Sequence, residues 1–178
     1  MFSSEIKVED QKIGLEHPTY FIADIAANWD SSIDRAKDLI CLAAEAGADA
    51  AKFQNFQAET IISSHSFENM EGKLTHQKSW QKSVFEVYND ASLPVEWTEE
   101  LKRTCEENNI HYFTTPYSLK VVDELKNHVS AWKIGSGDIT WIEIIEYIAR
   151  KNKPYILATG AASLTDVKRA VNSGLKYN

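Results

Sequence analysis

Two lysines, each at the end of a short apolar stretch, are the residues of this sequence best suited to binding an anion. Lys52 and Gln54 lie two positions apart within residues 50–55, so their side chains face the same way if this stretch is a strand. A lysine among apolar neighbours needs a partner, because a buried ammonium group is rare unless it is paired. We therefore interpret Lys52 as binding a phosphate or carboxylate ligand, or as forming a salt bridge within the core.

The second lysine, Lys133, precedes the sequence Gly-Ser-Gly-Asp at residues 135–138. Glycines let the backbone approach an anion, consecutive N–H groups can surround it, and Ser136 adds a hydroxyl group. The pattern is not a dinucleotide-binding fingerprint, since Thr140 stands where the third glycine would be. It indicates anion binding beside Lys133, and an ordinary turn is the alternative.

Further polar residues end or interrupt the other apolar stretches. Thr115 and Thr159 each place a hydroxyl group before a loop, although threonine is also common in strands because of its shape. Asp24 lies inside an apolar stretch, where a carboxylate needs a cation or a donor, and Lys52 on the next stretch is the expected partner. Asp30 is as well suited to capping a helix as to binding a ligand.

A repeated strand-then-helix pattern positions these residues. Each apolar stretch ends in a polar cluster and precedes a helical pattern; the stretches are residues 20–28, 50–55, 111–117, 131–138 and 155–160. Helical spacing of apolar residues follows over 31–46, 95–107, 119–127 and 141–151, and a last helix starts at Ser163. The order predicts five βα units and a parallel sheet, in which α/β enzymes hold their chemistry at the carboxyl ends of the strands.

Capping residues indicate where three of these helices begin and where one ends. Spacing typical of a capping box is found for Ser31 with Asp34, for Thr140 with Glu143 and for Ser163 with Asp166, and Gly47 is a helix stop.

The similar polar endings favour a closed barrel over a doubly wound sheet, where chemistry concentrates at one switch point. A (β/α)8 TIM barrel needs eight units and about 250 residues. We therefore predict an α/β fold in which residues 20–178 form such a barrel, truncated after about five units. The alternating pattern within residues 1–19 predicts a short hairpin that plugs the bottom of the sheet. Residues 57–93 form an insertion with a short helix near 79–88, interpreted as a lid or substrate loop, or as a solvated loop.

Composition excludes several classes of function. The net charge of −7 without a basic stripe argues against a nucleic-acid partner. No apolar stretch approaches the roughly 20 residues that span a bilayer, and no signal peptide precedes the first strand. Cys41 and Cys105 fall in helical patterns, which favours reduced thiols in a cytoplasmic protein. The five histidines show no ligand spacing, so the sequence predicts no metal site from these residues.

Taken together, five segments resemble the sialic acid synthase family, also called nonulosonate or N-acetylneuraminate synthases. The segments are residues 22–28, 46–54, 113–116, 132–138 and 156–160, and the resemblance runs from about residue 3 to the last residue. The resemblance implies a (β/α)8 barrel that joins phosphoenolpyruvate to an N-acylated hexosamine such as N-acetylmannosamine. It also implies a divalent metal, Mn²⁺ or Mg²⁺, that activates the open-chain aldehyde of the sugar.

The resemblance further implies the roles of the polar strand ends. Catalytic roles fall to Asp24, Lys52, Lys133 and Asp138, and substrate binding falls to Gln54, Thr115, Ser136 and Thr159. Asp24 and Asp138 stand where the family commonly has glutamate. At the position of Asp138, the resemblance implies contact with the sugar or assistance in proton transfer. Two departures are Trp29, where the family usually has histidine, and Ser31, where glycine is common.

By the same resemblance, the metal-binding histidines and a C-terminal antifreeze-like domain are expected beyond Asn178, and the full-length protein is expected to be a homodimer. Two other interpretations stay open. One is a barrel that forms a Schiff base through Lys133 or Lys52, as aldolases do. The other is a truncated reading frame that is inactive and acts only in binding.

Overall fold

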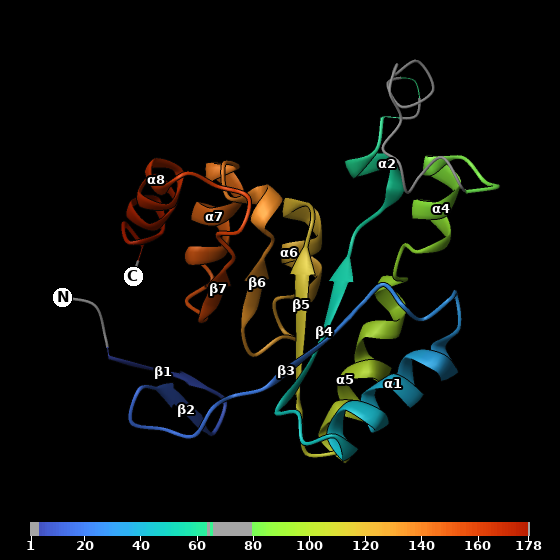
Figure 1. Cartoon of the computed structure of the whole chain (residues 1–178), viewed down its shortest axis with the longest axis horizontal. Coiled ribbons are helices and arrows are strands. Elements are labelled where there is room, and N and C mark those ends of the chain that lie inside the picture. The colour runs from blue at the N-terminus through green and yellow to red at the C-terminus, as the bar shows by residue number, and fades with distance from the viewer. Residues whose placement is uncertain (1–3, 64, 66–79, 178) are drawn as a thin grey trace.

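Five parallel strands form one sheet in which each strand lies beside the next one in the sequence. The computed structural model describes residues 4–63, 65 and 80–177. The strands are β3 (Ile22–Ala26), β4 (Ala50–Asn55), β5 (His111–Pro116), β6 (Trp132–Ile134) and β7 (Tyr155–Leu157). Helices follow the strands, so the predicted α/β class with a parallel sheet is confirmed (Figure 1). This order results when successive strand–helix units wind in one direction.

The helices cover one face of this sheet and bury a common core. They are α1 (Ile33–Glu45), α5 (Thr98–Glu107), α6 (Leu119–Leu125), α7 (Ile142–Ala149) and α8 (Leu164–Gly174), with the short η2 (Val95–Trp97) leading into α5. Helix α1 packs against α5, β3 and β4, helix α5 packs against β5, and α6, α7 and α8 follow along the other strands (Figure 1). Apolar residues at helical spacing, such as Ile40, Leu101 and Ile145, are fully buried against the sheet. No helix in the described part of the chain is both long and apolar enough to cross a membrane.

The helix starts agree only partly with the predicted capping boxes. The box at Ser163 and Asp166 forms, with each side chain accepting the backbone N–H of the other residue. Helix α1 is instead capped by Ser32, because Ser31 has φ 57° and belongs to the preceding turn. The prediction at Thr140 was wrong, since the tight turn after β6 leaves α7 without a side-chain cap. The predicted stop after α1 is confirmed, with the glycine at position 47 at φ 86°.

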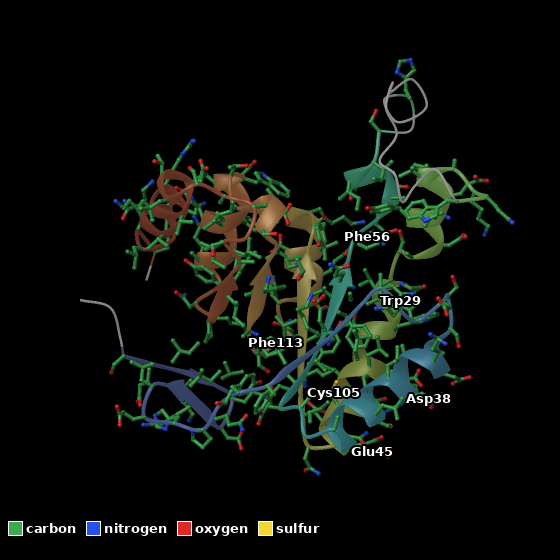
Figure 2. All side chains as sticks on the ribbon, viewed as in Figure 1. Trp29, Asp38, Glu45, Phe56, Cys105 and Phe113 are labelled. Carbon is green, nitrogen blue, oxygen red and sulfur yellow. The ribbon has the colours of Figure 1, made fainter. Side chains whose placement is uncertain are left out.

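Two antiparallel strands lie beneath the amino ends of the parallel sheet. Strands β1 (Glu5–Val8) and β2 (Gln11–Gly14) pair with each other and join a second apolar cluster with Ala50 and Phe113 (Figure 2). Val8 is 1% exposed in this cluster. Phe53, three positions after Ala50 in β4, belongs instead to the main core under the helices. Since side chains alternate along a strand, the second cluster marks the inner face of the sheet, opposite the helices.

Part of the predicted insertion over 57–93 is described. It contains α2 (Ala58–Ile61) and α4 (Val84–Asp90), so its helix lies slightly later than predicted, and residues 64 and 66–79 lie outside the described residues. The N–H group of Ala58 donates to Ser92 Oγ at 3.2 Å, which joins the start of the insertion to its end. The insertion therefore leaves and returns at the carboxyl end of β4.

Removing part of the Val8 side chain should destabilise the protein. Val8→Ala deletes two buried methyl groups and leaves a cavity, so we expect the free energy of unfolding to fall by about 2 kcal/mol. Urea denaturation measures this change. Ile6 lies in the same strand but is 41% exposed, so Ile6→Ala is the matched control and should cost less than half as much. An equal loss for both variants would contradict the buried contact between β1 and the sheet.

Candidate functional site

A cavity of about 290 Å³ at the carboxyl ends of the strands collects most of the predicted site residues. Seven of the eight line it, namely Asp24, Lys52, Gln54, Thr115, Lys133, Ser136 and Asp138. Thr159 is exposed beyond β7, and its neighbour Ala158 lines the cavity instead. We call this cavity the lysine pocket.

The register of the strands brings these side chains together. Asp24 in β3 lies opposite Lys52 in β4, and Gln54 in β4 lies opposite Thr115 in β5. Residues opposite each other in neighbouring strands point to the same face, here the inner face of the sheet. An irregularity in β3 follows directly after Asp24, where Ala26 adopts φ 54°. Regular pairing of β3 therefore extends just far enough to fix Asp24 beside Lys52.

The predicted partnership of Asp24 and Lys52 is confirmed. Lys52 Nζ lies 2.8 Å from Asp24 Oδ1, and the two side chains are 8% and 62% exposed. The pair is thus asymmetric, because the ammonium group is buried while most of the carboxylate side chain faces solvent. Lys52 fits both of its predicted interpretations at once, since it forms a salt bridge and also lines the lysine pocket.

Lys133 presents a second, less compensated positive charge. Its Nζ donates a hydrogen bond to the carbonyl oxygen of Ile134 at 3.2 Å, and it forms no ion pair among the described residues. Burial lowers the pKa of Lys133, and the positive charge of Lys52 lowers it further, while Asp24 and Asp138 oppose this change. Two ammonium groups that repel each other in one pocket favour an anion between them.

The Gly-Ser-Gly segment folds as a tight turn that places a carboxyl group against its own backbone. Residues Ser136–Asp138 form the 3₁₀ turn η3, and the N–H group of Asp138 donates to the carbonyl oxygen of Gly135 at 3.1 Å. A Cβ atom on Gly135 would lie 2.7 Å from Asp138 Oδ2, so a larger residue there would require the Asp138 carboxyl group to move, whereas Gly137 has open space. Burial raises the pKa of Asp138, although the positive charge of Lys133 opposes this change.

Tyr117 also lines the lysine pocket, and the residue pattern gave it no role. Its hydroxyl oxygen accepts a hydrogen bond from Gln54 Nε2 at 3.2 Å, and its ring meets Phe56 edge-on. Burial, together with the negative charge of Asp138, raises the pKa of Tyr117 to about 12. Its place at the end of the apolar stretch over 111–117, where the other stretches carry polar residues, was the available sequence signal.

Two of the residues that depart from the resembled family, Trp29 and Ser31, lie outside the pocket. Trp29 is fully buried in the main core, with its ring 6.1 Å from that of Phe53. Ser31 adopts φ 57°, a conformation in which glycine is unstrained, so the common glycine of the family has a conformational explanation. Asp30 pairs with Arg35 at 3.2 Å and neither caps α1 nor lines the pocket.

The pocket residues do not make a complete metal site. Asp24 and Asp138 are the carboxylates that line it, and no histidine is among its described lining residues. One group with metal-binding chemistry was missed from the sequence, at the opposite ends of the strands, where ligand atoms of Glu9, Asp10 and His111 lie within 4.8 Å of one another. The described residues therefore do not fit the divalent metal that the resemblance implies at the pocket, and no step below is routed through it.

The fold and the site thus define an α/β protein with a pocket lined by two lysines at the carboxyl ends of a parallel sheet. The model of the NeuB family matches residues 39–176, and the chain belongs to this family. It is 33% identical over 158 residues to N,N'-diacetyllegionaminic acid synthase of Campylobacter jejuni, a match that covers 86% of this chain and 46% of that protein. It is 32% identical over 165 residues to the spore coat polysaccharide biosynthesis protein SpsE of Bacillus subtilis, covering 92% and 43%.

A solved structure shows the same arrangement. The N-acetylneuraminic acid synthetase of Leptospira borgpetersenii, determined in complex with citrate, superposes with a TM-score of 0.82 at 28% identity. The match covers 98% of this chain and 56% of that one. The chain spans about half the length of the curated relatives that it matches.

The charge of Lys133 should make anion binding sensitive to pH. Because its pKa is lowered, Lys133 loses its proton at a lower pH than an ordinary lysine, so affinity for sulfate should fall on the alkaline side before an ordinary lysine titrates. Sulfate is the probe because its charge is constant across neutral and alkaline pH. Calorimetric titration should show the decline shifted to higher pH in Lys133→Arg. The control Lys168→Arg, on the exposed surface of α8, should leave the profile unchanged, and a parent profile that is flat with pH would refute the role of Lys133.

Proposed function

We propose that the lysine pocket binds phosphoenolpyruvate and that the protein acts as a nonulosonic (sialic-type) acid synthase. The convergence of Lys52 and Lys133 with the hydroxyl group of Ser136 is the observation that carries this proposal. Phosphoenolpyruvate has a phosphate and a carboxylate, and two ammonium groups with several neutral donors suit two anionic groups. Membership of the NeuB family, and relatives named as synthases of such acids, support the same activity.

The proposed reaction joins phosphoenolpyruvate to an N-acylated hexosamine such as N-acetylmannosamine. The enol carbon attacks the aldehyde carbon of the sugar, water adds to the resulting oxocarbenium carbon, and phosphate leaves by C–O cleavage. Lys52 and Lys133 would hold the anionic groups, and these fixed charges would also stabilise the charge that develops on the departing phosphate.

The other pocket residues have roles that follow from their surroundings. Gln54, Thr115 and Ser136 would donate hydrogen bonds to the bound anion or to the sugar. Asp138 is our candidate for the group that gives a proton to the aldehyde oxygen, because burial raises the pKa of its carboxyl group. Asp24 would hold the Lys52 ammonium group in position. A substrate contact by Thr159 remains a prediction.

The five βα units would be part of a (β/α)8 barrel, whose mouth is the lysine pocket. The homodimer and the cytoplasmic location stay predictions, and ligands for a divalent metal would have to come from outside the lysine pocket. The relatives are named for different nonulosonic acids, so the test uses a panel of sugars.

Release of phosphate from phosphoenolpyruvate tests the proposed function. The protein expressed from its own gene should release phosphate only when an N-acylated hexosamine is added, across a panel of free and 6-phosphorylated sugars with Mn²⁺ or Mg²⁺. Lys133→Ala removes a charged donor, so the affinity for phosphoenolpyruvate should fall about 10- to 100-fold by calorimetry. The exposed control Lys168→Ala should bind as the parent does, and unchanged affinity in Lys133→Ala would end the assignment.

A second candidate function is favoured by one observation. Burial lowers the pKa of Lys133, and a neutral lysine amine is what a Schiff base with a carbonyl substrate requires. Borohydride reduction in the presence of pyruvate separates the two functions. A synthase should show no covalent adduct by mass spectrometry, whereas a stable adduct on Lys133 would establish the aldolase.

A further inference from the structure

A second cavity, of about 490 Å³, lies beside the lysine pocket. Aromatic rings of Phe56, Tyr88 and Trp141 line it, together with the aliphatic side chains of Ile61 and Ile62. We call it the aromatic pocket. Phe56 lies just beyond the carboxyl end of β4, close to α4, and its ring packs 5.7 Å from that of Tyr88 (Figure 2). The two pockets differ in chemistry, because one presents ammonium groups and hydroxyl groups and the other presents rings and methyl groups.

Three polar residues line both pockets and therefore form the partition between them. They are Gln54, Tyr117 and Asp138. Gln54 Nε2 donates to the Tyr117 hydroxyl oxygen at 3.2 Å. A Cβ atom built on Gly135 would lie 2.7 Å from Asp138 Oδ2 and 3.7 Å from the Tyr117 hydroxyl oxygen, so both groups approach the same glycine. The partition is thus the group of side chains at which the two pockets adjoin.

Tyr117 is held at this partition through both its backbone and its ring. Its N–H group donates to the carbonyl oxygen of Asn55 at 3.1 Å, which anchors it to the residue directly after Gln54. Its ring meets Phe56 at an interplanar angle of 88° with the centroids 5.8 Å apart. Because its backbone and its ring are both held in place, Tyr117 loses little conformational entropy when it orients a neighbouring side chain.

The hydrogen bond from Gln54 has a direction that matters for a ligand. Because the Tyr117 oxygen accepts, the tyrosine keeps its own proton for another acceptor, and its pKa of about 12 keeps that proton in place at neutral pH. One N–H of the Gln54 side-chain amide donates to Tyr117, which leaves its carbonyl oxygen and its second N–H for other partners. The amide of Gln54 is therefore fixed in one orientation by Tyr117.

We propose that Tyr117 is a positioning residue for the acceptor: it orients the Gln54 amide at the place where the lysine pocket, which holds the anion, adjoins the aromatic pocket, which holds an uncharged N-acylated sugar. This inference rests on the proposed function. The aromatic pocket suits the apolar face and the acyl group of such a sugar, while the partition supplies the few polar groups that fix its orientation. The anion and the acceptor would then meet beside Gln54, Tyr117 and Asp138, with no side chain between the enol carbon and the aldehyde carbon that join.

The test compares two tyrosines that lose only a hydroxyl group. Tyr117→Phe keeps the ring on Phe56 but loses the acceptor for Gln54, so KM for the parent's best N-acylated hexosamine should rise about three- to tenfold. The dissociation constant for phosphoenolpyruvate should stay within twofold by calorimetry. Tyr147→Phe is the matched control, because Tyr147 lines neither pocket and its hydroxyl group donates to Asp123 instead, so its KM values should stay within twofold of the parent.

A double-mutant cycle tests whether Tyr117 acts through Gln54. If it does, adding Tyr117→Phe to Gln54→Ala should raise KM for the sugar by less than twofold beyond Gln54→Ala alone. A merely structural role would instead lower the melting temperature and kcat without this dependence on Gln54.

Each other outcome overturns the inference. An unchanged KM for the sugar in Tyr117→Phe, or a full additional loss in the Gln54→Ala background, would remove the positioning role. A parallel loss of phosphoenolpyruvate affinity would make Tyr117 part of the anion site instead. If the folded parent protein neither binds phosphoenolpyruvate nor turns over any sugar of the panel, the proposed function itself fails, and this inference falls with it.

Discussion

The burial of one ammonium group constrains both the sheet and the site. Lys52 is 8% exposed, and its charge is compensated by Asp24 from the neighbouring strand at 2.8 Å. A buried charge without a partner costs several kcal/mol. If β3 slipped by one residue along β4, Asp24 would point toward the helices and Lys52 would lose its partner. The ion pair therefore specifies the same register that aligns the pocket residues of the neighbouring strands.

The inner face of the sheet divides into two halves along the strands. Toward the amino ends, Ala50 and Phe113 bury apolar surface against the two-stranded β1–β2 unit. Toward the carboxyl ends, Lys52 and Gln54 lie two and four positions after Ala50 in β4, and the inner face becomes polar. Strand alternation sends the intervening Phe53 to the helix side, where it joins the main core. One short strand thus contributes to a hydrophobic core on each face and to the site at one end.

Local patterns carried most of the prediction from sequence, and long-range packing accounts for what was missed. The periodicity of apolar residues located the strands and helices, and polar residues at strand ends located the lysine pocket. Each of these patterns is contained within a few consecutive residues, so the sequence alone reveals it. The role of Tyr117 depends on its contact with Gln54, 63 positions away, and no local pattern records that contact. The group of Glu9, Asp10 and His111 was missed for the same reason. The error at Ser31 was local, since its hydroxyl group had the right spacing but its backbone the wrong conformation.

The placement of the β1–β2 unit has a consequence for the order in which the chain folds. Every pairing within the parallel sheet joins strands that are consecutive in the sequence, so these contacts close comparatively short loops. The β1–β2 unit, in contrast, reaches across the chain, with Ser130 Oγ donating to the carboxylate of Glu9 over a separation of 121 residues. The entropic cost of closing a loop grows with its length, so this contact is favoured only after the intervening βα units have made the chain compact. The β1–β2 unit precedes the sheet in the chain but would be among the last of the described elements to reach its final place, and its docking would complete this end of the sheet, opposite the pocket.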